Sequence, residues 1–179
     1  MNVERDFSCF LASLIEAGAK IDSHYFKQHV TGSKKPIFRE RVYCYEFYHQ
    51  LRCILGDDFP YKLDGELDKQ AHPILAGQKK PDFVVHVPGN MDRNLAVIEV
   101  KRARANHTEI RGDIKKLKGF LDTAEYYKAI MLIYGDENSN VKYARSEINS
   151  LPKEYAERIL LVWHKKPEEK PEVVQISKP

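Results

Sequence analysis

Residues 81–101 read PDFVVHVPGNMDRNLAVIEVK, and the rest of the fold can be worked out from them. Residues 83–87 and 95–101 are largely apolar runs of strand length. Between them, Pro88-Gly89-Asn90 is typical of a turn. The stretch therefore predicts two neighbouring strands joined by a short connection.

Charged residues stand at one end of this predicted pair. Side chains two residues apart on a strand share a face, so Glu99 and Lys101 leave the second strand on the same side. Asp82 stands at the start of the first strand, and pairing of the two strands brings its carboxylate near that of Glu99. We therefore expect two carboxylates and one ammonium group to converge.

Periodicity on either side of this pair predicts an α/β domain. Three strands in sequence indicate an antiparallel meander or a mixed sheet, with further helices and strands around it. The predicted order is a helix over 7–18, a short helix over 22–30, a helix over 36–55, strands over 61–68, 82–87 and 95–101, a helix from Thr108 to 124, a strand over 129–134, a helix over 141–149 and a strand over 158–163.

Length and composition indicate a single globular domain. The chain has 179 residues, of which 42% are hydrophobic and 11% aromatic, enough for one core but not for two independent ones. We place the domain at residues 1–164, with its core at about 36–134. Residues 165–179 are rich in proline, lysine and glutamate, and we expect them to form a flexible C-terminal tail.

Several classes of protein find no support in the sequence. The net charge of +3 is too small to indicate a nucleic-acid partner by itself. No apolar run approaches the roughly 18 residues of a membrane span, and the N-terminus lacks the pattern of a secretory signal. The cysteines, Cys9, Cys44 and Cys53, have neither disulfide nor zinc spacing. We therefore expect a cytoplasmic protein without a membrane partner.

The triplet Asp82, Glu99 and Lys101 predicts metal chemistry. Two close carboxylates repel each other unless a cation lies between them, and Mg²⁺ prefers oxygen ligands. A nearby lysine can orient a water molecule while the metal stabilises charge on a phosphate oxygen. We therefore predict Mg²⁺ as the cofactor, with Mn²⁺ able to substitute.

This pattern resembles the PD-(D/E)xK nuclease superfamily. Its restriction-endonuclease-like core is a helix, three strands, a helix and a strand, which matches the predicted order from about Pro36 to Tyr134. The resemblance implies that Asp82 and Glu99 bind the metal and that Lys101 positions the water. It also implies a mixed central sheet, to which this chain adds an N-terminal helix and a C-terminal helix and strand.

Cores of this kind often add a glutamate from the helix that precedes the first strand. Glu40 lies on the apolar face of that predicted helix, but the N-terminal dipole also explains a carboxylate there. Glu66 fits a solvated acidic strand face. Glu46 lies among aromatic residues in mid-helix, where an unpaired carboxylate is costly. Residues 45–52 also resemble small uncharacterised bacterial proteins with this core, and Glu46 is therefore favoured as the fourth catalytic residue.

Basic residues follow the triplet, and one edge of the helix after them could track a phosphate backbone. A solvated helix face is the alternative. The nucleic-acid-binding candidates are Arg102, Arg104, Arg111, Lys115 and Lys118.

The sequence thus predicts a metal-dependent nuclease that hydrolyses phosphodiester bonds, in DNA first and with RNA left open, and able to act as a homodimer. Two alternatives remain. The fold could serve a catalytically silent nucleic-acid-binding or assembly subunit, or Asp82, Glu99 and Lys101 could form a structural salt-bridge cluster in an α/β interaction protein.

Overall fold

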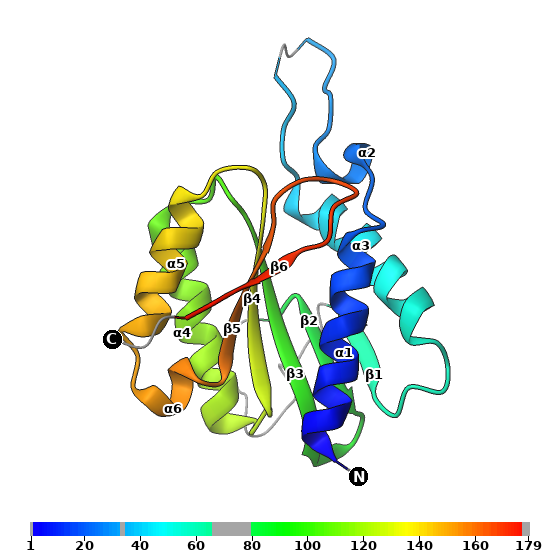
Figure 1. The fold of residues 1–179 in the computed structure, drawn as a ribbon, viewed down its shortest axis with the longest axis vertical. Coiled ribbons are helices and arrows are strands. Elements are labelled where there is room, and N and C mark those ends of the chain that lie inside the picture. Colours follow the sequence, from blue (N-terminus) through cyan, green and yellow to red (C-terminus); the bar gives the residue numbers. More distant parts are fainter. Residues whose placement is uncertain (1, 33–34, 66–79, 177–179) are drawn as a thin grey trace.

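The protein is an α/β layer structure built on a mixed sheet, seen in a computed structural model that describes residues 2–32, 35–65 and 80–176 (Figure 1). Within this part of the chain six strands follow one another across the sheet in sequence order. They are β1 (Lys62–Gly65), β2 (Phe83–Val87), β3 (Asn90–Arg102), β4 (Lys128–Tyr134), β5 (Ile159–His164) and β6 (Glu172–Val174).

Strand directions divide the sheet into three parts. β1, β2 and β3 form an antiparallel meander, β3, β4 and β5 run parallel, and β6 returns antiparallel to β5. The predicted α/β class is therefore confirmed, and of the two predicted arrangements the sheet is the mixed one. β2 and β3 pair with Phe83 opposite Ile98, which places Asp82 beside the carboxyl end of β3.

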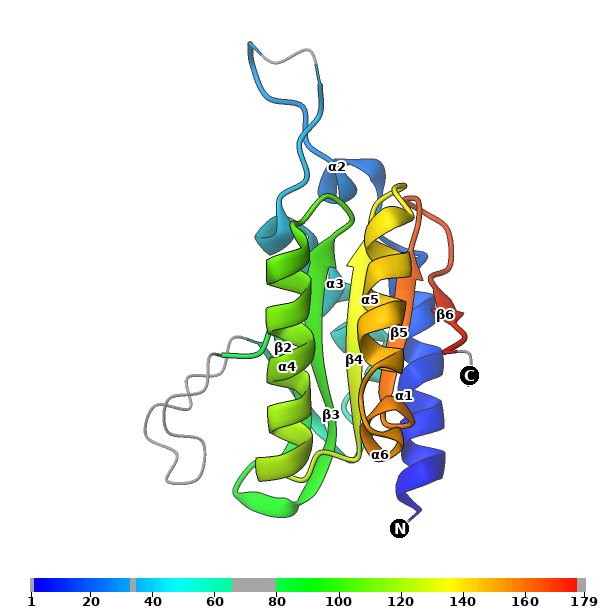
Figure 2. The ribbon, with the colours of Figure 1, turned by 90° about the vertical axis from the view of Figure 1, so that its left-hand side faces the viewer.

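Helices cover both faces of this sheet. α1 (Val3–Gly18) and α3 (Glu40–Leu55) lie on one face, and α4 (His107–Thr123) and α5 (Ser139–Asn149) lie on the other (Figure 2). Two short helices, α2 (Ser23–Phe26) and α6 (Lys153–Ala156), complete the described set. No helix in the described ranges is long and apolar enough to cross a membrane.

Local sequence signals explain where several helices begin and end. Asn2 caps α1 by accepting hydrogen bonds from two backbone N–H groups of its first turn. α3 ends at Gly56, whose φ of 66° suits glycine. The sequence predicted that α4 begins at Thr108. The N-cap is Asn106 rather than Thr108, and the helix begins at His107. Both residues carry side-chain oxygens able to cap a helix, which is why the sequence pattern could not choose between them.

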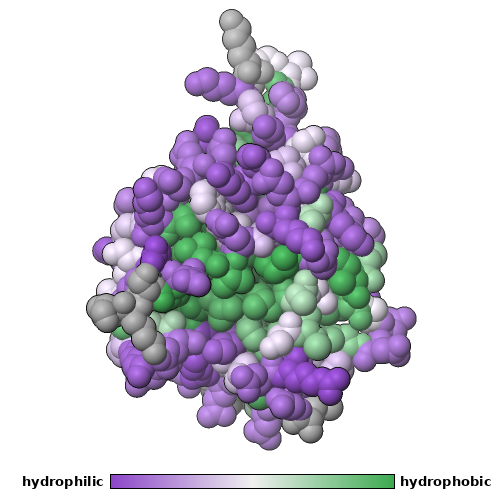
Figure 3. Space-filling view, viewed as in Figure 1, coloured by the Kyte–Doolittle hydropathy of each residue, from purple (hydrophilic) through white to green (hydrophobic). Residues whose placement is uncertain are grey.

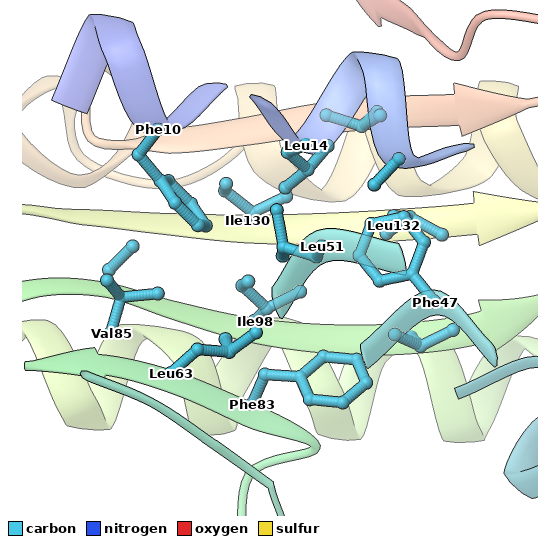
Figure 4. Packing of buried hydrophobic residues seen from close by; sticks show 14 of the residues in the cluster. Phe10, Leu14, Phe47, Leu51, Leu63, Phe83, Val85, Ile98, Ile130 and Leu132 are labelled. Atoms are coloured by element: carbon cyan, nitrogen blue, oxygen red, sulfur yellow. The ribbon is translucent and has the colours of Figure 1, made fainter. Parts of the chain in front are cut away.

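Apolar side chains alternate between two cores along the central strands. On the face of α1 and α3, Ile98 of β3 and Ile130 of β4 join a cluster with aromatic helix residues such as Phe47 (Figure 4). On the face of α4 and α5, Val97 and Met131 join a second cluster. Positions 99 and 101 of β3 belong to this second face by alternation, so the two charged side chains stand where apolar residues would otherwise pack.

The predicted flexible tail is wrong for residues 165–176. β6 pairs with β5 from Leu161 to Trp163, and the backbone N–H of Glu168 donates to the carbonyl of Ile21. Val173 and Val174 favour a strand, and this preference outweighs the effect of the surrounding prolines and charges. Figure 3 shows apolar residues gathered on the side of the molecule that carries α1 and β6 in Figure 1. Ile159, Leu160 and Val174 line a cavity of about 560 Å³ next to β6.

Two other predicted elements are shorter than expected. The helix predicted over 22–30 is only α2, because its chain continues as an extended segment whose Gln28 pairs with Ile37. Of the strand predicted over 61–68, Lys62–Gly65 is present as β1, Tyr61 lies just before it, and residues 66–68, including Glu66, lie outside the described residues.

Candidate functional site

The predicted triplet meets at the carboxyl end of β3, on the face covered by α4. Asp82 immediately precedes β2, and its Oδ2 accepts a hydrogen bond of 2.7 Å from the backbone N–H of Val100. This bond ties the start of β2 to β3 one residue past Glu99. Asp82 is thereby held at the strand end by the backbone of its neighbour rather than by its own rotamer preference alone.

Glu99 is the most enclosed charge of the site. Its side chain is 2% exposed, and its Oε1 lies 2.7 Å from Nζ of Lys116, a residue of α4. Burial and the neighbouring charge of Asp82 raise the pKa of the Glu99 carboxyl well above its ordinary value, although Lys116 acts in the opposite direction. The carboxylate form of Glu99 is therefore held at a cost that an additional cation would reduce.

Lys101 bridges two elements that pack on opposite faces of the sheet. Its Nζ lies 3.1 Å from Oε1 of Glu40, at the start of α3, and 3.1 Å from Oδ2 of Asp113 on α4. Burial lowers the pKa of Lys101, but Glu40 and Asp113 together more than offset this and raise the pKa above its usual range. Lys101 is thus a fixed cation at neutral pH.

The pKa of Asp82 is also raised by burial and by neighbouring negative charge. Burial raises its pKa to about 6, and the charge of Glu40 adds to the increase, although the hydrogen bond from Val100 opposes it. Both predicted metal ligands are therefore carboxylates whose ionised forms are unfavourable without a cation. We call Glu40, Asp82, Glu99, Lys101, Asp113 and Lys116 the charged cluster.

The donor set suits a divalent cation that is bound by few protein ligands. Asp82 and Glu99 provide hard carboxylate oxygens, and the Coulomb coupling between them would be relieved by a cation. Within residues 2–32, 35–65 and 80–176, no group of three or more His, Cys, Asp or Glu side chains is arranged to hold a metal. A cation at Asp82 and Glu99 would therefore take its other ligands from water or substrate, as Mg²⁺ commonly does.

A cavity of about 650 Å³ opens beside Asp82. It lies between α3 and the β1–β2 edge, and its walls include Glu40, Cys44 and the exposed ring of Tyr45. Burial, together with the charges of Asp82 and Glu40, raises the pKa of the Cys44 thiol. The carboxylates of Glu40 and Asp82 are therefore reachable from a space large enough for a substrate group.

The fourth carboxylate of the cluster is Glu40, whereas Glu46, predicted as the fourth catalytic residue, makes its contact elsewhere on α3. Glu46 accepts a hydrogen bond of 2.6 Å from Gln50 on its own helix, whereas Glu40 contacts Lys101. The helical periodicity had placed Glu40 on the inward face, and this signal was correct. The mid-helix position of Glu46 misled because an amide on the same helix already satisfies it.

The predicted basic edge of α4 does not form a free surface. Arg111 makes two hydrogen bonds to Glu147 of α5, at 2.9 and 3.0 Å, and Lys118 pairs with Asp122. Among the described residues, Lys115 of that edge is exposed and makes no contact of this kind. The Arg111 pair therefore links α4 to α5, and the Lys118 pair lies within α4.

The remaining basic candidates lie at the same end of the sheet as the charged cluster. Arg102 is exposed at the last position of β3. Arg104 pairs with Glu137 at 2.9 Å and lies over the ring of Phe38. The sequence prediction thus placed these two residues near the site but did not find their partners.

Two members of the charged cluster have no role in the sequence prediction. They are Asp113 and Lys116 of α4. Their spacing of three residues puts both on one side of the helix, next to the apolar positions Ile110, Ile114 and Leu117. A charged pair bordering the buried stripe of a helix was the signal that could have identified them.

Known proteins provide no additional information about the site. No family model, no curated protein and no solved structure matches the chain. The functional argument therefore rests on the geometry and chemistry of the charged cluster.

Proposed function

We propose that the protein is a metal-dependent nuclease with a restriction-endonuclease-like core, acting on DNA. The observation that carries this proposal is the pair Asp82 and Glu99, two crowded carboxylates on neighbouring strands whose ionised forms call for a cation. Lys101 leaves the same face of β3 two residues after Glu99. The order α3, β1, β2, β3, α4, β4 follows the helix, three strands, helix and strand of that core.

Each residue has a role that its surroundings support. Asp82 and Glu99 would hold Mg²⁺, and the bound ion would stabilise charge on the phosphate. Lys101, held as a cation by Glu40 and Asp113, would orient the attacking water and favour its ionisation electrostatically. Lys116 balances the charge of Glu99 from α4. Glu40 sets the position of Lys101 and faces the cavity beside Asp82.

The complete pairing of the cluster supports a second candidate, a catalytically silent nucleic-acid-binding subunit. Lys101 contacts two carboxylates and Lys116 contacts Glu99, so the ion pairs close without a metal. Such a subunit would bind DNA without metal-dependent cleavage. The two candidates therefore differ in a measurable way.

The test is cleavage of linear, plasmid and single-stranded DNA with Mg²⁺ or Mn²⁺, and with chelator. We expect metal-dependent cleavage that falls at least about a thousandfold in Asp82→Asn, Glu99→Gln and Lys101→Met, because each removes several kcal/mol of transition-state stabilisation. Full activity in any one of the three would overturn the assignment of that residue. Binding of DNA without cleavage by the wild type would favour the silent subunit.

Glu40 and Glu46 provide a matched pair on one helix. Glu40→Gln should lower cleavage about ten- to a hundredfold, since Lys101 loses one of its two anchors. Glu46→Gln should retain activity because Glu46 contacts Gln50 instead. The reverse result would show that Glu46 moves into the site when substrate binds.

A further inference from the structure

Residues 27–32 and 35–39 leave the body of the protein as the two sides of a long hairpin (Figure 1). The two sides meet where Gln28 and Ile37 exchange backbone hydrogen bonds of 2.8 and 2.9 Å. Figures 1 and 2 show the hairpin projecting beyond the carboxyl ends of the parallel strands. We call its described part, residues 27–32 and 35–39, the basic arm.

Aromatic packing fixes the base of the basic arm. Phe26 and Phe38, at its two ends, have ring centroids 6.1 Å apart. Both rings also pack against Tyr134 at the end of β4, at 5.6 and 5.9 Å. The arm therefore leaves the core from a rigid platform, and its direction relative to the sheet is set by core residues.

The charge of the basic arm has one sign. Between Asp22 and Glu40 the sequence contains no acidic residue, while Lys27, Lys35 and Arg39 belong to the described arm. Lys35 and Arg39 are exposed. Arg104, whose guanidinium lies 5.6 Å above the Phe38 ring, and the exposed Arg102 extend this positive surface onto the end of β3.

The basic arm joins the charged cluster directly. Arg39 is the N-cap of α3, and the next residue, Glu40, contacts Lys101 at 3.1 Å. A polyanion held along the arm would therefore pass the end of β3, where Asp82 and Glu99 lie. The arm therefore leads directly into the charged cluster through Arg39 and Glu40.

We propose that the basic arm enters the major groove of duplex DNA and holds the duplex at the charged cluster; this inference rests on the proposed function for its choice of substrate. The B-form major groove admits a two-stranded ribbon, and the three extended residues 28–30 span about 10 Å against a groove depth of about 8.5 Å. The narrow major groove of A-form RNA does not admit one.

The same arm is poorly suited to single strands. Stacking of unpaired bases needs exposed aromatic rings, and the aromatic residues nearest the arm, Phe26 and Phe38, are engaged in its base. The exposed residues along the described arm are instead polar or cationic, apart from the small apolar Val30 and the imidazole of His29, the smallest of the rings on which bases stack. These residue types contact phosphates and groove edges.

The experiment measures binding of a 30-base-pair duplex by fluorescence anisotropy in chelator, so that cleavage is not needed. The variant is Lys35→Gln with Arg39→Gln, and the matched control is Arg5→Gln with Lys153→Gln, two exposed cations on α1 and α6. Loss of two phosphate contacts should lower the slope of log K against log salt by about two and weaken binding about tenfold or more at 0.1 M salt. The control should bind like the wild type.

Further variants and ligands distinguish the possible failures. Lys35→Arg with Arg39→Lys should retain binding, because the charges are kept, and the arm variants should affect single-stranded DNA far less than duplex. Unchanged duplex affinity and salt slope in the neutral variant, an equal loss in the control, or no duplex binding by the wild type would each overturn the inference. If the arm variant loses duplex binding although the wild type never cleaves DNA, the nuclease proposal fails and the arm inference stands.

Discussion

Two groups of buried polar side chains lie at the carboxyl ends of the parallel strands, on opposite faces of the sheet. The charged cluster lies under α4, and its members carry full charges in contact with one another. Under α3, Tyr43, Tyr134 and His164 form what we call the neutral network. Both groups interrupt an apolar core at the same end of the molecule, but they do so with different electrostatics.

The neutral network satisfies burial by staying uncharged. The hydroxyl of Tyr43 and Nδ1 of His164 share a hydrogen bond of 2.8 Å, and the Tyr43 ring stacks on Tyr134 with centroids 4.0 Å apart. Burial lowers the pKa of His164 to about 4, and backbone contacts offset only part of this. The network is therefore neutral at pH 7 and contributes packing without a charge to solvate.

The charged cluster has the opposite energetics. Its ion pairs are buried, and replacing such pairs by apolar residues is often neutral or stabilising in other proteins. A chain that keeps several of them at one strand end is maintaining charge at the expense of stability. The difference teaches that the neutral network is structural and that the charged cluster is the place to look for function.

The largest expected effect comes from removing one cation of the charged cluster. Lys116→Met leaves Glu99, which is 2% exposed, without its partner at 2.7 Å. We expect the free energy of unfolding to fall by about 3 kcal/mol at pH 8, because an uncompensated buried charge is strongly unfavourable. Urea denaturation followed by circular dichroism measures this.

A second variant and a control test the explanation. Adding Glu99→Gln to Lys116→Met should recover most of the lost stability, since the charge is then gone. Lys166→Met, which breaks an exposed pair with Glu169, should change stability by less than about 0.5 kcal/mol. If Lys116→Met costs no more than this control, Glu99 is not held as a charge and the contrast between the two groups disappears.

The sequence was sufficient to predict the triplet because its signal is local. Glu99 and Lys101 share a strand face by alternation alone, and Asp82 needs only a turn to reach them. The α/β class followed from periodicity for the same reason. By contrast, the contacts of Asp113 and Lys116 depend on how α4 rotates against the sheet, which no short pattern of residues specifies.

Errors arose where tertiary contacts override local preference. β6 forms in a stretch of prolines and charges because β5 offers an unpaired edge. The burial argument for Glu46 failed for a local reason instead, because its side chain is only half-buried and Gln50 on the same helix donates a hydrogen bond to it. The neutral network was missed entirely, because Tyr43 and His164 are 121 positions apart and only the packing of α3 on β5 brings them together.

The next effect concerns the acid stability of the neutral network. His164 is neutral when folded, but below its ordinary pKa of 6.5 the unfolded chain gains a proton there. Stability is therefore lost as the pH falls from 6.5 toward 4, by about 3 kcal/mol in total for this residue. His164→Asn removes that loss while keeping a polar partner for Tyr43, so its stability should depend less on pH between 7 and 4.

Denaturation curves at pH 7, 5.5 and 4 provide the measurement. Tyr25→Phe, which keeps a half-buried ring outside the network, serves as the control and should follow the wild type. An unchanged pH dependence in His164→Asn would mean that His164 is protonated within the fold, and the network would then not be neutral.

The smallest effect is also the one that best separates a metal site from a structural ion-pair cluster. The pKa of Asp82 is raised to about 6, so the folded protein holds this proton more tightly than the unfolded chain. The contribution of Asp82 to stability is thus unfavourable at pH 7 and disappears as the pH falls through 6 toward 4. Asp82→Asn should therefore stabilise the protein at pH 7 by about 1–2 kcal/mol, after allowance for its partial exposure.

Magnesium should make the wild type more stable than Asp82→Asn. An ion held by Asp82 and Glu99 stabilises the folded wild type by about 2.7 kcal/mol at a hundred times its dissociation constant, and the variant should lose most of that gain. Asp57→Asn, on an exposed turn, controls for the change in net charge. A structural cluster predicts the opposite pattern, because losing Asp82 would then cost stability at pH 7 and magnesium would have no effect. The stabilities of the wild type and of Asp82→Asn should therefore cross as magnesium is added, and this crossing depends on metal binding and not on packing.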